Sequence, residues 1–254
     1  MHLYIIRHAQ STNNEIYART NGSEGRLADP PLTELGHRQA QLLARFLTEP
    51  PRVIDETKLV WEYAARHDRR GFDLTHLYCS LMIRAVQTGS YIAEATGLPL
   101  VAWPEVHERG GLHIIDEVTG KDIGQPGPNR AQFNQEYPHL VLPETLGEKG
   151  WWDRPPETIE ESYPRAHQVW TQLMERHGGT DDRVAIVTHG GFFQSLIGVL
   201  LSDGDPPQVP GLSATGVWFG ISNTSINRFR ITDKRVDLYY LNNVEFLPDE
   251  FVTG

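Results

Sequence analysis

The sequence predicts an α/β protein: a three-layer α/β/α sandwich with a mainly parallel sheet and an antiparallel edge strand. Short apolar runs rich in β-branched residues alternate along the chain with longer amphipathic segments, which is typical of a parallel sheet covered by helices. Residues 217–240 instead alternate apolar and polar residues around a turn at Asp233 and Lys234, which predicts the antiparallel edge.

Length and composition favour one globular domain over residues 1–254. The chain is 39% hydrophobic and 22% charged, which is ordinary for a protein with a sizeable core. A net charge of −10 argues against nucleic acid as a partner, because phosphate-backbone binding needs a broad basic surface. Cys79 is the only cysteine, and no apolar stretch has the length of a membrane span or a signal segment. These features predict a cytoplasmic protein with no membrane partner. They do not indicate an oligomeric state.

The first apolar run, Leu3–Ile6, predicts a buried strand that ends abruptly at Arg7 and His8. Residues 12–31, rich in Asn, Gly and Pro, are expected to form a loop, and Thr33 is expected to cap the helix that follows. Residues 49–71 resemble an insertion after that helix.

The second expected strand, Thr75–Cys79, is followed by Ser80, a favourable helix N-cap. Arg84 then falls in the first turns of the next helix, close to the end of the strand. The third expected strand, Leu100–Trp103, leads into a segment with two glutamates, Glu105 and Glu108.

Residues 112–156 are rich in Gly, Pro and Asn and contain aromatic residues, which predicts a cap or lid rather than a disordered segment. A capping-box pattern at Thr158 then begins an amphipathic helix that closes at residues 177–179. The buried run Val184–Val187 ends in Thr188-His189-Gly190-Gly191, and a strongly apolar core helix follows.

Chemically active residues therefore follow three of the expected strands. Parallel neighbours present their carboxyl ends at one crevice, so the chain would gather two arginines and two histidines there. This cationic set suits a dianionic phosphoryl group, because arginine binds phosphate oxygens in a bidentate way. Free backbone N–H groups at Gly190 would add to anion binding. The residues of the set are Arg7, His8, Arg84 and His189.

Two histidines in one phosphate pocket suggest covalent catalysis, in which a neutral imidazole nitrogen attacks phosphorus and forms a phosphohistidine. The leaving alkoxide needs a proton, and Glu105 and Glu108 are the candidates to supply it. The same carboxylate would then activate the water that hydrolyses the phosphoenzyme. The scheme calls for no metal and no other cofactor.

Four ordered motifs resemble those of the histidine phosphatase superfamily, which includes cofactor-dependent phosphoglycerate mutases. Residues 7–11 (RHAQS) with Asn14 are similar to its RHG-[EQ]-S-x-x-N signature, with Ala9 in place of the usual glycine. Three further stretches resemble its L-[ST]-x-x-G, S-P-L-x-R-A-x-Q-T and [VS]-[ST]-H-G motifs. They are residues 31–36 (PLTELG), 80–88 (SLMIRAVQT) and 187–191 (VTHGG).

The resemblance implies a phosphoglycerate mutase-like fold and assigns roles to residues. His8 would be the phosphorylated nucleophile. Glu108 fits the spacing h-x-E-x-x-G of the family's acid better than Glu105 does. The groups that would bind the phosphoryl oxygens are Arg7, Asn14, Asn21, Arg84, His189 and Gly190.

The favoured hypothesis is a metal-independent phosphomonoesterase for small phosphate esters. A phosphoglycerate mutase is the alternative within the family, and the basic residues of the expected cap would then bind a second phosphate: Lys121, Arg130, Lys149 and Arg154. A non-enzymatic phospho-ligand-binding module is a third hypothesis. A metallohydrolase, in which His107 and His113 join His8 and His189 around a metal, is a fourth.

Overall fold

The described part of the chain is organised around a seven-stranded sheet with the strand order β6-β3-β2-β7-β1-β8-β9. The computed structural model describes residues 1–22, 24–50, 71–116, 118–201 and 217–254. The strands of this sheet are β1 (His2–Arg7), β2 (His76–Cys79), β3 (Leu100–Ala102), β6 (Leu140–Val141), β7 (Arg183–Thr188), β8 (Ile226–Ile231) and β9 (Val236–Asn243). The first five are parallel, whereas β8 and β9 are antiparallel and form one edge.

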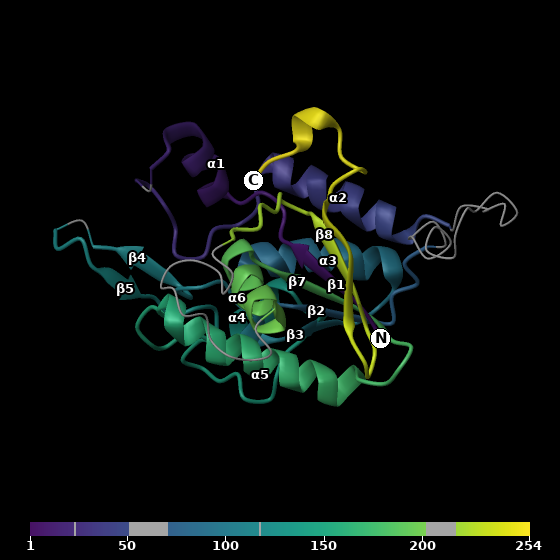
Figure 1. The fold of residues 1–254 in the computed structure, drawn as a ribbon. Coiled ribbons are helices and arrows are strands. Elements are labelled where there is room, and N and C mark those ends of the chain that lie inside the picture. The colour runs from purple at the N-terminus through teal and green to yellow at the C-terminus, as the bar shows by residue number, and fades with distance from the viewer. Residues whose placement is uncertain (23, 51–70, 117, 202–216) are drawn as a thin grey trace, which may run out of the picture.

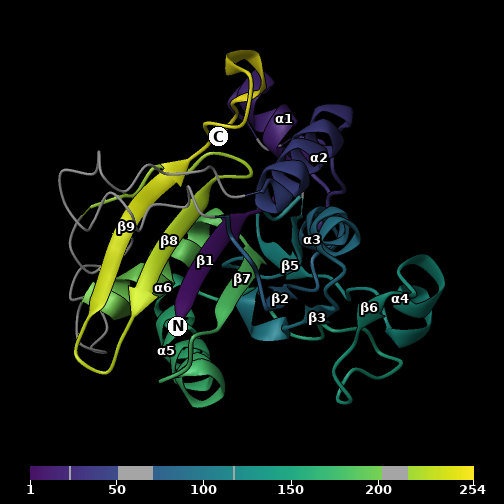
Figure 2. The ribbon, with the colours of Figure 1, turned by 90° about the vertical axis from the view of Figure 1, so that its right-hand side faces the viewer.

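Helices cover both faces of the sheet, as Figures 1 and 2 show, so the predicted three-layer sandwich is confirmed. The helices of one face are α2 (Glu34–Thr48) and α3 (Ile83–Thr96), and those of the other are α5 (Ile159–His177) and α6 (Gly190–Leu201). Each face has its own hydrophobic core.

Strand β1 shows why the sequences of the central strands are continuous apolar runs. Its successive side chains point to opposite faces. Tyr4 and Ile6 join the core under α2 and α3, whereas Leu3 and Ile5 join the core under α5 and α6. A strand that is buried on both faces needs an apolar residue at every position, which is the pattern that predicted it.

Residues 12–31 differ from the prediction, because they begin with a helix, α1 (Thr12–Thr20). Ser11 and Asn14 form its capping box: Ser11 Oγ accepts from the Asn14 N–H at 3.3 Å, and Asn14 Oδ1 accepts from the Ser11 N–H at 3.1 Å. None of the nine residues of α1 is buried. A helix without a buried face has no apolar stripe, so periodicity could not reveal it.

The helix caps were predicted with mixed success. Thr33 and Thr158 cap α2 and α5 as expected, by accepting hydrogen bonds from backbone N–H groups in the first turns. The expectation that Ser80 caps α3 is wrong, because the N-cap is Met82 and no side chain caps this helix. The Ser80 hydroxyl is used elsewhere, in a hydrogen bond to His189.

The segment 112–156, expected as a cap, contributes partly to the main sheet. Its elements are the antiparallel pair β4 (His113–Ile115) and β5 (Asp122–Gly124), helix α4 (Arg130–Glu136) and strand β6. Strand β6 pairs with β3 and extends the parallel sheet. Trp152 is buried against Met82 and Leu112, so it packs this segment onto the domain.

Short 3-10 helices at Pro104–Val106 and Asp249–Phe251 complete the described elements. The insertion expected at residues 49–71 lies almost entirely at 51–70, outside the described residues. No helix in the described ranges is long and apolar enough to cross a membrane.

Candidate active site

The site forms where three neighbouring parallel strands end. Strands β2, β7 and β1 are adjacent in the sheet, so the residues that follow them meet at one edge. His8 follows β1, Ser80 follows β2 and His189 follows β7. The imidazole rings of His8 and His189 lie 5.0 Å apart between centroids. The structure thus brings together the two histidines that the sequence predicted as partners.

The orientation of His8 follows from its two hydrogen bonds. Nδ1 lies 2.7 Å from the carbonyl oxygen of Ala9, which can only accept, so Nδ1 carries the proton. Nε2 therefore holds a lone pair, and it accepts a hydrogen bond from Arg84 Nε at 3.1 Å. The side chain is 3% exposed. His8 thus offers one unprotonated nitrogen, held beside a cation.

Charge and burial keep His8 neutral. Burial first, and then the positive charges of Arg84 and Arg7, hold the pKa of His8 well below its ordinary value. Burial also lowers the pKa of Arg7 and Arg84, but a guanidinium group stays charged at neutral pH. A neutral imidazole beside two fixed cations is suited to attack a negatively charged phosphoryl group.

His189 is held by Ser80, and one of its nitrogens has no partner. Ser80 Oγ accepts from the Met82 N–H at 3.3 Å and lies 2.7 Å from His189 Nε2. The hydroxyl proton is therefore free to be donated to Nε2, which places the ring proton on Nδ1. Nδ1 is buried and makes no hydrogen bond within the described residues. A buried donor left without an acceptor is ready for a ligand oxygen.

Glu108 lies at the start of α6 and is bound by backbone amides. Its carboxylate accepts from the N–H groups of Arg109 at 2.8 Å, Gly191 at 3.1 Å and Phe192 at 2.8 Å. A Cβ at Gly191 would collide with Glu108 Oε1, so the absent side chain at this position makes room for the carboxylate. Glu105, by contrast, lines a separate cavity together with Arg154 and Glu157.

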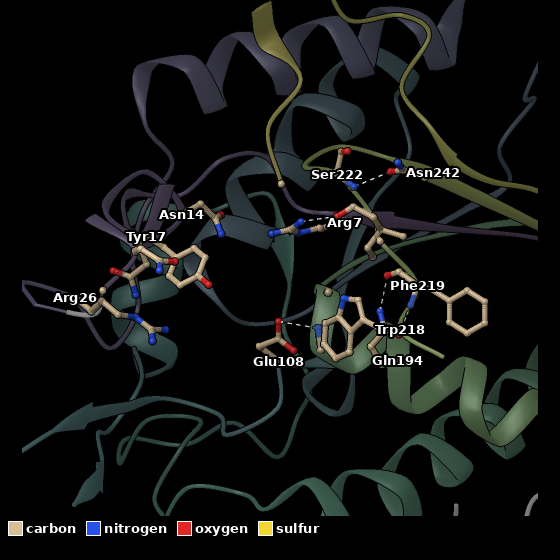
Figure 3. Close-up of a pocket in the computed structure, with 18 residues that line it drawn as sticks. Arg7, Asn14, Tyr17, Arg26, Glu108, Gln194, Trp218, Phe219, Ser222 and Asn242 are labelled. Carbon is tan, nitrogen blue, oxygen red and sulfur yellow. Dashed lines mark hydrogen bonds between the residues drawn. The ribbon is translucent and has the colours of Figure 1, made fainter. Parts of the chain in front are cut away.

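A cavity of about 1040 Å³ opens above these groups, and we call it the site cavity. Figure 3 shows its lining, with Arg7, Asn14 and Glu108 around a common space. His8, Arg84 and His189 are buried and do not belong to this lining. Arg7 donates to the Ile221 carbonyl oxygen at 2.5 Å, while its Nε is buried without a partner in the described residues.

The three remaining predicted ligands all line the site cavity. Asn14 Oδ1 is used by the capping box, and Figure 3 shows the side chain of Asn14 directed toward Arg7. Asn21 is the exposed C-cap of α1, with φ of 52°. Gly190 is the first residue of α6, and a Cβ there would lie 3.6 Å from Arg7 Nε.

The sequence did not identify two residues that hold the site. Asn223 is fully buried and donates to the His8 carbonyl oxygen at 3.0 Å and to Asn14 Oδ1 at 3.3 Å. Asn223 belongs to a short polar run before β8. Only the burial of this run marks it as part of the site, and burial cannot be recognised in a sequence. Asp29 lies 3.9 Å from Arg84 and accepts from the Ile83 N–H at 3.0 Å. Burial raises the pKa of Asp29 to about 6, against the opposing charge of Arg84.

The metal hypothesis required His107 and His113 to join His8 and His189. His107 instead contacts the Glu108 carbonyl oxygen and Arg154, and His113 lies on β4. Among the described residues, the group of metal-binding side chains that lies close enough to hold an ion is His76, His177 and Asp182. This group lies at the amino end of β2 and β7, away from the site cavity.

Fold and site together define a class: α/β proteins in which two histidines and two arginines meet at the carboxyl ends of neighbouring parallel strands. The sequence model of the histidine phosphatase superfamily (branch 1) matches residues 3–57 and 61–244. The chain therefore belongs to the histidine phosphatase superfamily, an assignment that the motifs predicted. It is a phosphatase-like or mutase-like enzyme of that superfamily.

A curated relative is the probable phosphoglycerate mutase GpmB of Yersinia pestis (strain Pestoides F). It is 25% identical over 201 residues, which are 79% of this chain and 75% of the relative. Among solved structures, the phosphoserine phosphatase of Entamoeba histolytica in complex with 3-phosphoglyceric acid has a TM-score of 0.56 at 16% identity, covering 97% of this chain and 99% of that one. A mycobacterial glucosyl-3-phosphoglycerate phosphatase with inorganic phosphate has a TM-score of 0.54 at 20% identity, with coverages of 97% and 99%. At these identities the structures establish the shared fold.

Proposed function

We propose that this protein is a metal-independent phosphomonoesterase that hydrolyses small phosphate esters through a phosphohistidine on His8. The observation that carries the proposal is the orientation of His8, with Nδ1 bound to a carbonyl oxygen and Nε2 free of a proton. Nε2 lies beside Arg84, where a phosphoryl oxygen would be bound. Membership of the histidine phosphatase superfamily supports the same chemistry.

In the first step, His8 Nε2 attacks phosphorus in line with the ester oxygen. The P–N bond forms as the P–O bond breaks, and the electron pair leaves with the ester oxygen. Negative charge spreads over the three equatorial oxygens of the phosphoryl group. Arg7, Arg84 and the Nδ1–H of His189 would offset this charge, and stabilisation of this kind is usually the largest single contribution to the rate.

Glu108 completes the cycle. In its protonated form it donates to the leaving ester oxygen, and the alcohol departs. The resulting carboxylate takes a proton from a water molecule whose oxygen attacks the phosphohistidine. The P–N bond then breaks, inorganic phosphate leaves, and His8 returns to the neutral imidazole with which the cycle began.

A phosphoglycerate mutase is the second candidate. It is favoured by the name of the curated relative and by Arg26, a second cation on the wall of the site cavity. A mutase needs a second strong phosphate site, and the cationic residues of segment 112–156 are absent from the described lining of the site cavity. Arg130 binds carbonyl oxygens, and Arg154 stacks on Trp152. We therefore favour hydrolysis.

The test measures phosphate release from p-nitrophenyl phosphate by the wild type and by His8→Ala. We expect release to vanish in His8→Ala, to be inhibited by vanadate and to persist in the presence of chelators. Release that survives in His8→Ala would overturn the proposal, and release that a chelator abolishes would indicate a metallohydrolase. A parallel assay with 3-phosphoglycerate covers the alternative, since mutase turnover above the rate of phosphate release would identify a mutase.

A further inference from the structure

The site cavity contains both of the strongly exposed aromatic side chains in the described residues. Tyr17 is 60% exposed and Trp218 is 58% exposed, and the other exposed large hydrophobic residues in those ranges are aliphatic. Both line the site cavity together with Arg7. Rings of this size are normally buried, so their joint exposure at one cavity indicates that they bind something flat and apolar.

The two rings come from distant parts of the chain. Tyr17 belongs to α1, and Trp218 precedes β8. Figure 3 shows Tyr17 beside Asn14 on one side of the site cavity and Trp218 near Glu108 and Gln194 on the other, with the side chain of Arg7 between the two sides. A ligand bound through its phosphoryl group at Arg7 would therefore extend outward between two aromatic walls.

The backbone beside each ring is fixed. Helix α1 begins in the capping box, and Asn223 donates to Asn14 in its first turn. Next to Trp218, the Phe219 N–H donates to Gln194 Oε1 at 3.0 Å, and Gln194 Nε2 donates to the Phe219 carbonyl oxygen at 2.8 Å. Two hydrogen bonds to one side chain of α6 hold this segment in place. The aromatic walls are thus parts of a built site.

The charges of the lining complement a ligand with one anionic end. Arg7 and Glu108 lie near the groups that would bind the phosphoryl oxygens, and Arg26 is the one further charged residue of the described lining. Arg7 and Glu108 are partly buried, whereas Arg26 and the two rings are exposed. Such a division suits an amphipathic ester: a phosphoryl group at one end and a ring at the other.

We propose that the site cavity selects phosphate monoesters whose alcohol carries a flat, uncharged ring, which stacks on Trp218 and Tyr17. This inference names the substrate class and rests on the proposed function only for the step of hydrolysis. Stacking and burial of a phenyl-sized ring predict a preference of about tenfold or more over a short alkyl chain that carries no ring.

Binding is measured first with compounds that cannot be hydrolysed. Calorimetry compares the Kd of 2-phenylethylphosphonate with that of propylphosphonate for the wild type, for Trp218→Ala, for Tyr17→Ala and for the ring-retaining variants Trp218→Phe and Tyr17→Phe. We expect the wild type and the ring-retaining variants to prefer the phenyl compound by about tenfold, and each alanine variant to lose most of that preference. Leu238→Ala, an exposed apolar residue of β9 outside the described lining, is the matched control and should keep the preference.

Equal Kd values in the wild type would overturn the inference, and so would a phenyl preference that both alanine variants retain. Turnover of 2-phenylethyl phosphate and propyl phosphate then tests the reaction, because these esters have alkoxide leaving groups of similar basicity. A phenyl preference in binding without any turnover would overturn the proposed hydrolysis and leave the ring site intact. Tighter binding of 3-phosphoglycerate than of 2-phenylethylphosphonate, with no effect of Trp218→Ala, would assign the cavity to a second anionic group instead.

Discussion

The two ends of the parallel sheet each hold a pair of histidines, and the pairs differ in their neighbours. At the carboxyl end, His8 and His189 lie 5.0 Å apart between ring centroids. At the amino end, where β2 and β7 begin, His76 and His177 lie 4.5 Å apart. The spacing of the rings is similar, so spacing alone does not separate a reactive pair from a structural one.

The neighbours do separate them. Both ring nitrogens of His177 have partners, because Nδ1 lies 2.8 Å from Asp182 and Nε2 lies 3.0 Å from the Tyr78 hydroxyl. At the carboxyl end the one charged hydrogen-bond partner is a cation, Arg84, and burial together with the nearby cations holds the pKa of His8 and of His189 well below the ordinary value. His189 Nδ1 is left without a partner in the described residues. A histidine pair with satisfied hydrogen bonds stabilises a fold, whereas a pair of neutral histidines among cations is suited to bind an anion.

The largest expected effect comes from replacing one histidine at each end. His8→Ala should lower kcat for p-nitrophenyl phosphate by at least about 1000-fold, because the nucleophile is lost. His177→Ala should leave kcat within about twofold, because that ring contacts no group of the site cavity. Steady-state phosphate release under conditions in which both variants are folded measures this, and similar losses in the two variants would remove the distinction between the ends.

Replacing one arginine at each end gives the next effect. Arg84→Gln should lower kcat/KM by about 100-fold to 1000-fold, since a fixed cation at the transferring group is lost. Because Arg84 also depresses the pKa of His8, nitrogen NMR should find that His8 in this variant titrates at a higher pH than in the wild type. Arg176, which precedes His177 in the last turn of α5 and lies over the Trp103 ring, is the control, and Arg176→Gln should change kcat/KM by less than about threefold. A comparable loss in both variants would show that Arg84 acts through stability.

The two glutamates that follow β3 allow a sharper comparison. Glu108→Gln should slow hydrolysis by about tenfold to 100-fold for alkyl phosphates and much less for p-nitrophenyl phosphate, whose leaving group needs no proton. Glu105→Gln should behave like the wild type with both classes, because Glu105 lines the other cavity. The readout is the slope of log kcat/KM against leaving-group pKa, because kcat/KM excludes the later hydrolysis of the phosphohistidine, which Glu108→Gln slows for every substrate. A uniform loss across leaving groups in Glu108→Gln would count against its role as the acid.

The smallest effect concerns stability at the amino end. The hydrogen bond from His177 is the main cause that lowers the pKa of Asp182 below its ordinary value of 3.8. Because the pKa of Asp182 is lower in the folded protein, this hydrogen bond contributes to the free energy of unfolding. The contribution is fully present above the pKa of the unfolded chain and is lost as the pH falls through the pKa of the folded state. Asp182→Asn should therefore cost about 1 kcal/mol near neutral pH, and the difference from the wild type should shrink below about pH 4. Urea unfolding at several pH values measures it, and a difference that stays constant on acidification would contradict the assignment.

The sequence was most informative where chemistry and local pattern coincide. His8, Arg84 and His189 follow apolar strands directly or within a few residues, and parallel pairing of β1, β2 and β7 brings them together. The order of motifs and the apolar runs therefore sufficed to predict the fold and which residues meet at the ends of these strands.

What the sequence could not reveal depends on contacts between distant segments. Helix α1 has no buried residue, so its sequence lacks the regularly spaced apolar residues of an amphipathic helix. The two-residue strand β6 is too short to carry a pattern, and only its pairing with β3 identifies it. Trp218 and Tyr17 share the site cavity although neither belongs to a motif that predicts binding, and segment 112–156, expected to cover the site, is absent from the described lining.

The central claim is that phosphorus is transferred to His8. The most direct measurement mixes the wild type with p-nitrophenyl phosphate, quenches the reaction in alkali within milliseconds, and locates the phosphoryl group by peptide mass spectrometry. Alkaline quenching preserves phosphohistidine, and a Glu108→Gln background should increase its accumulation by slowing hydrolysis of the intermediate. The account predicts a phosphoryl group on His8, formed at least as fast as turnover, and none on His177. Turnover at the full rate with no phosphoryl group on His8, or with the label on another residue, would contradict it.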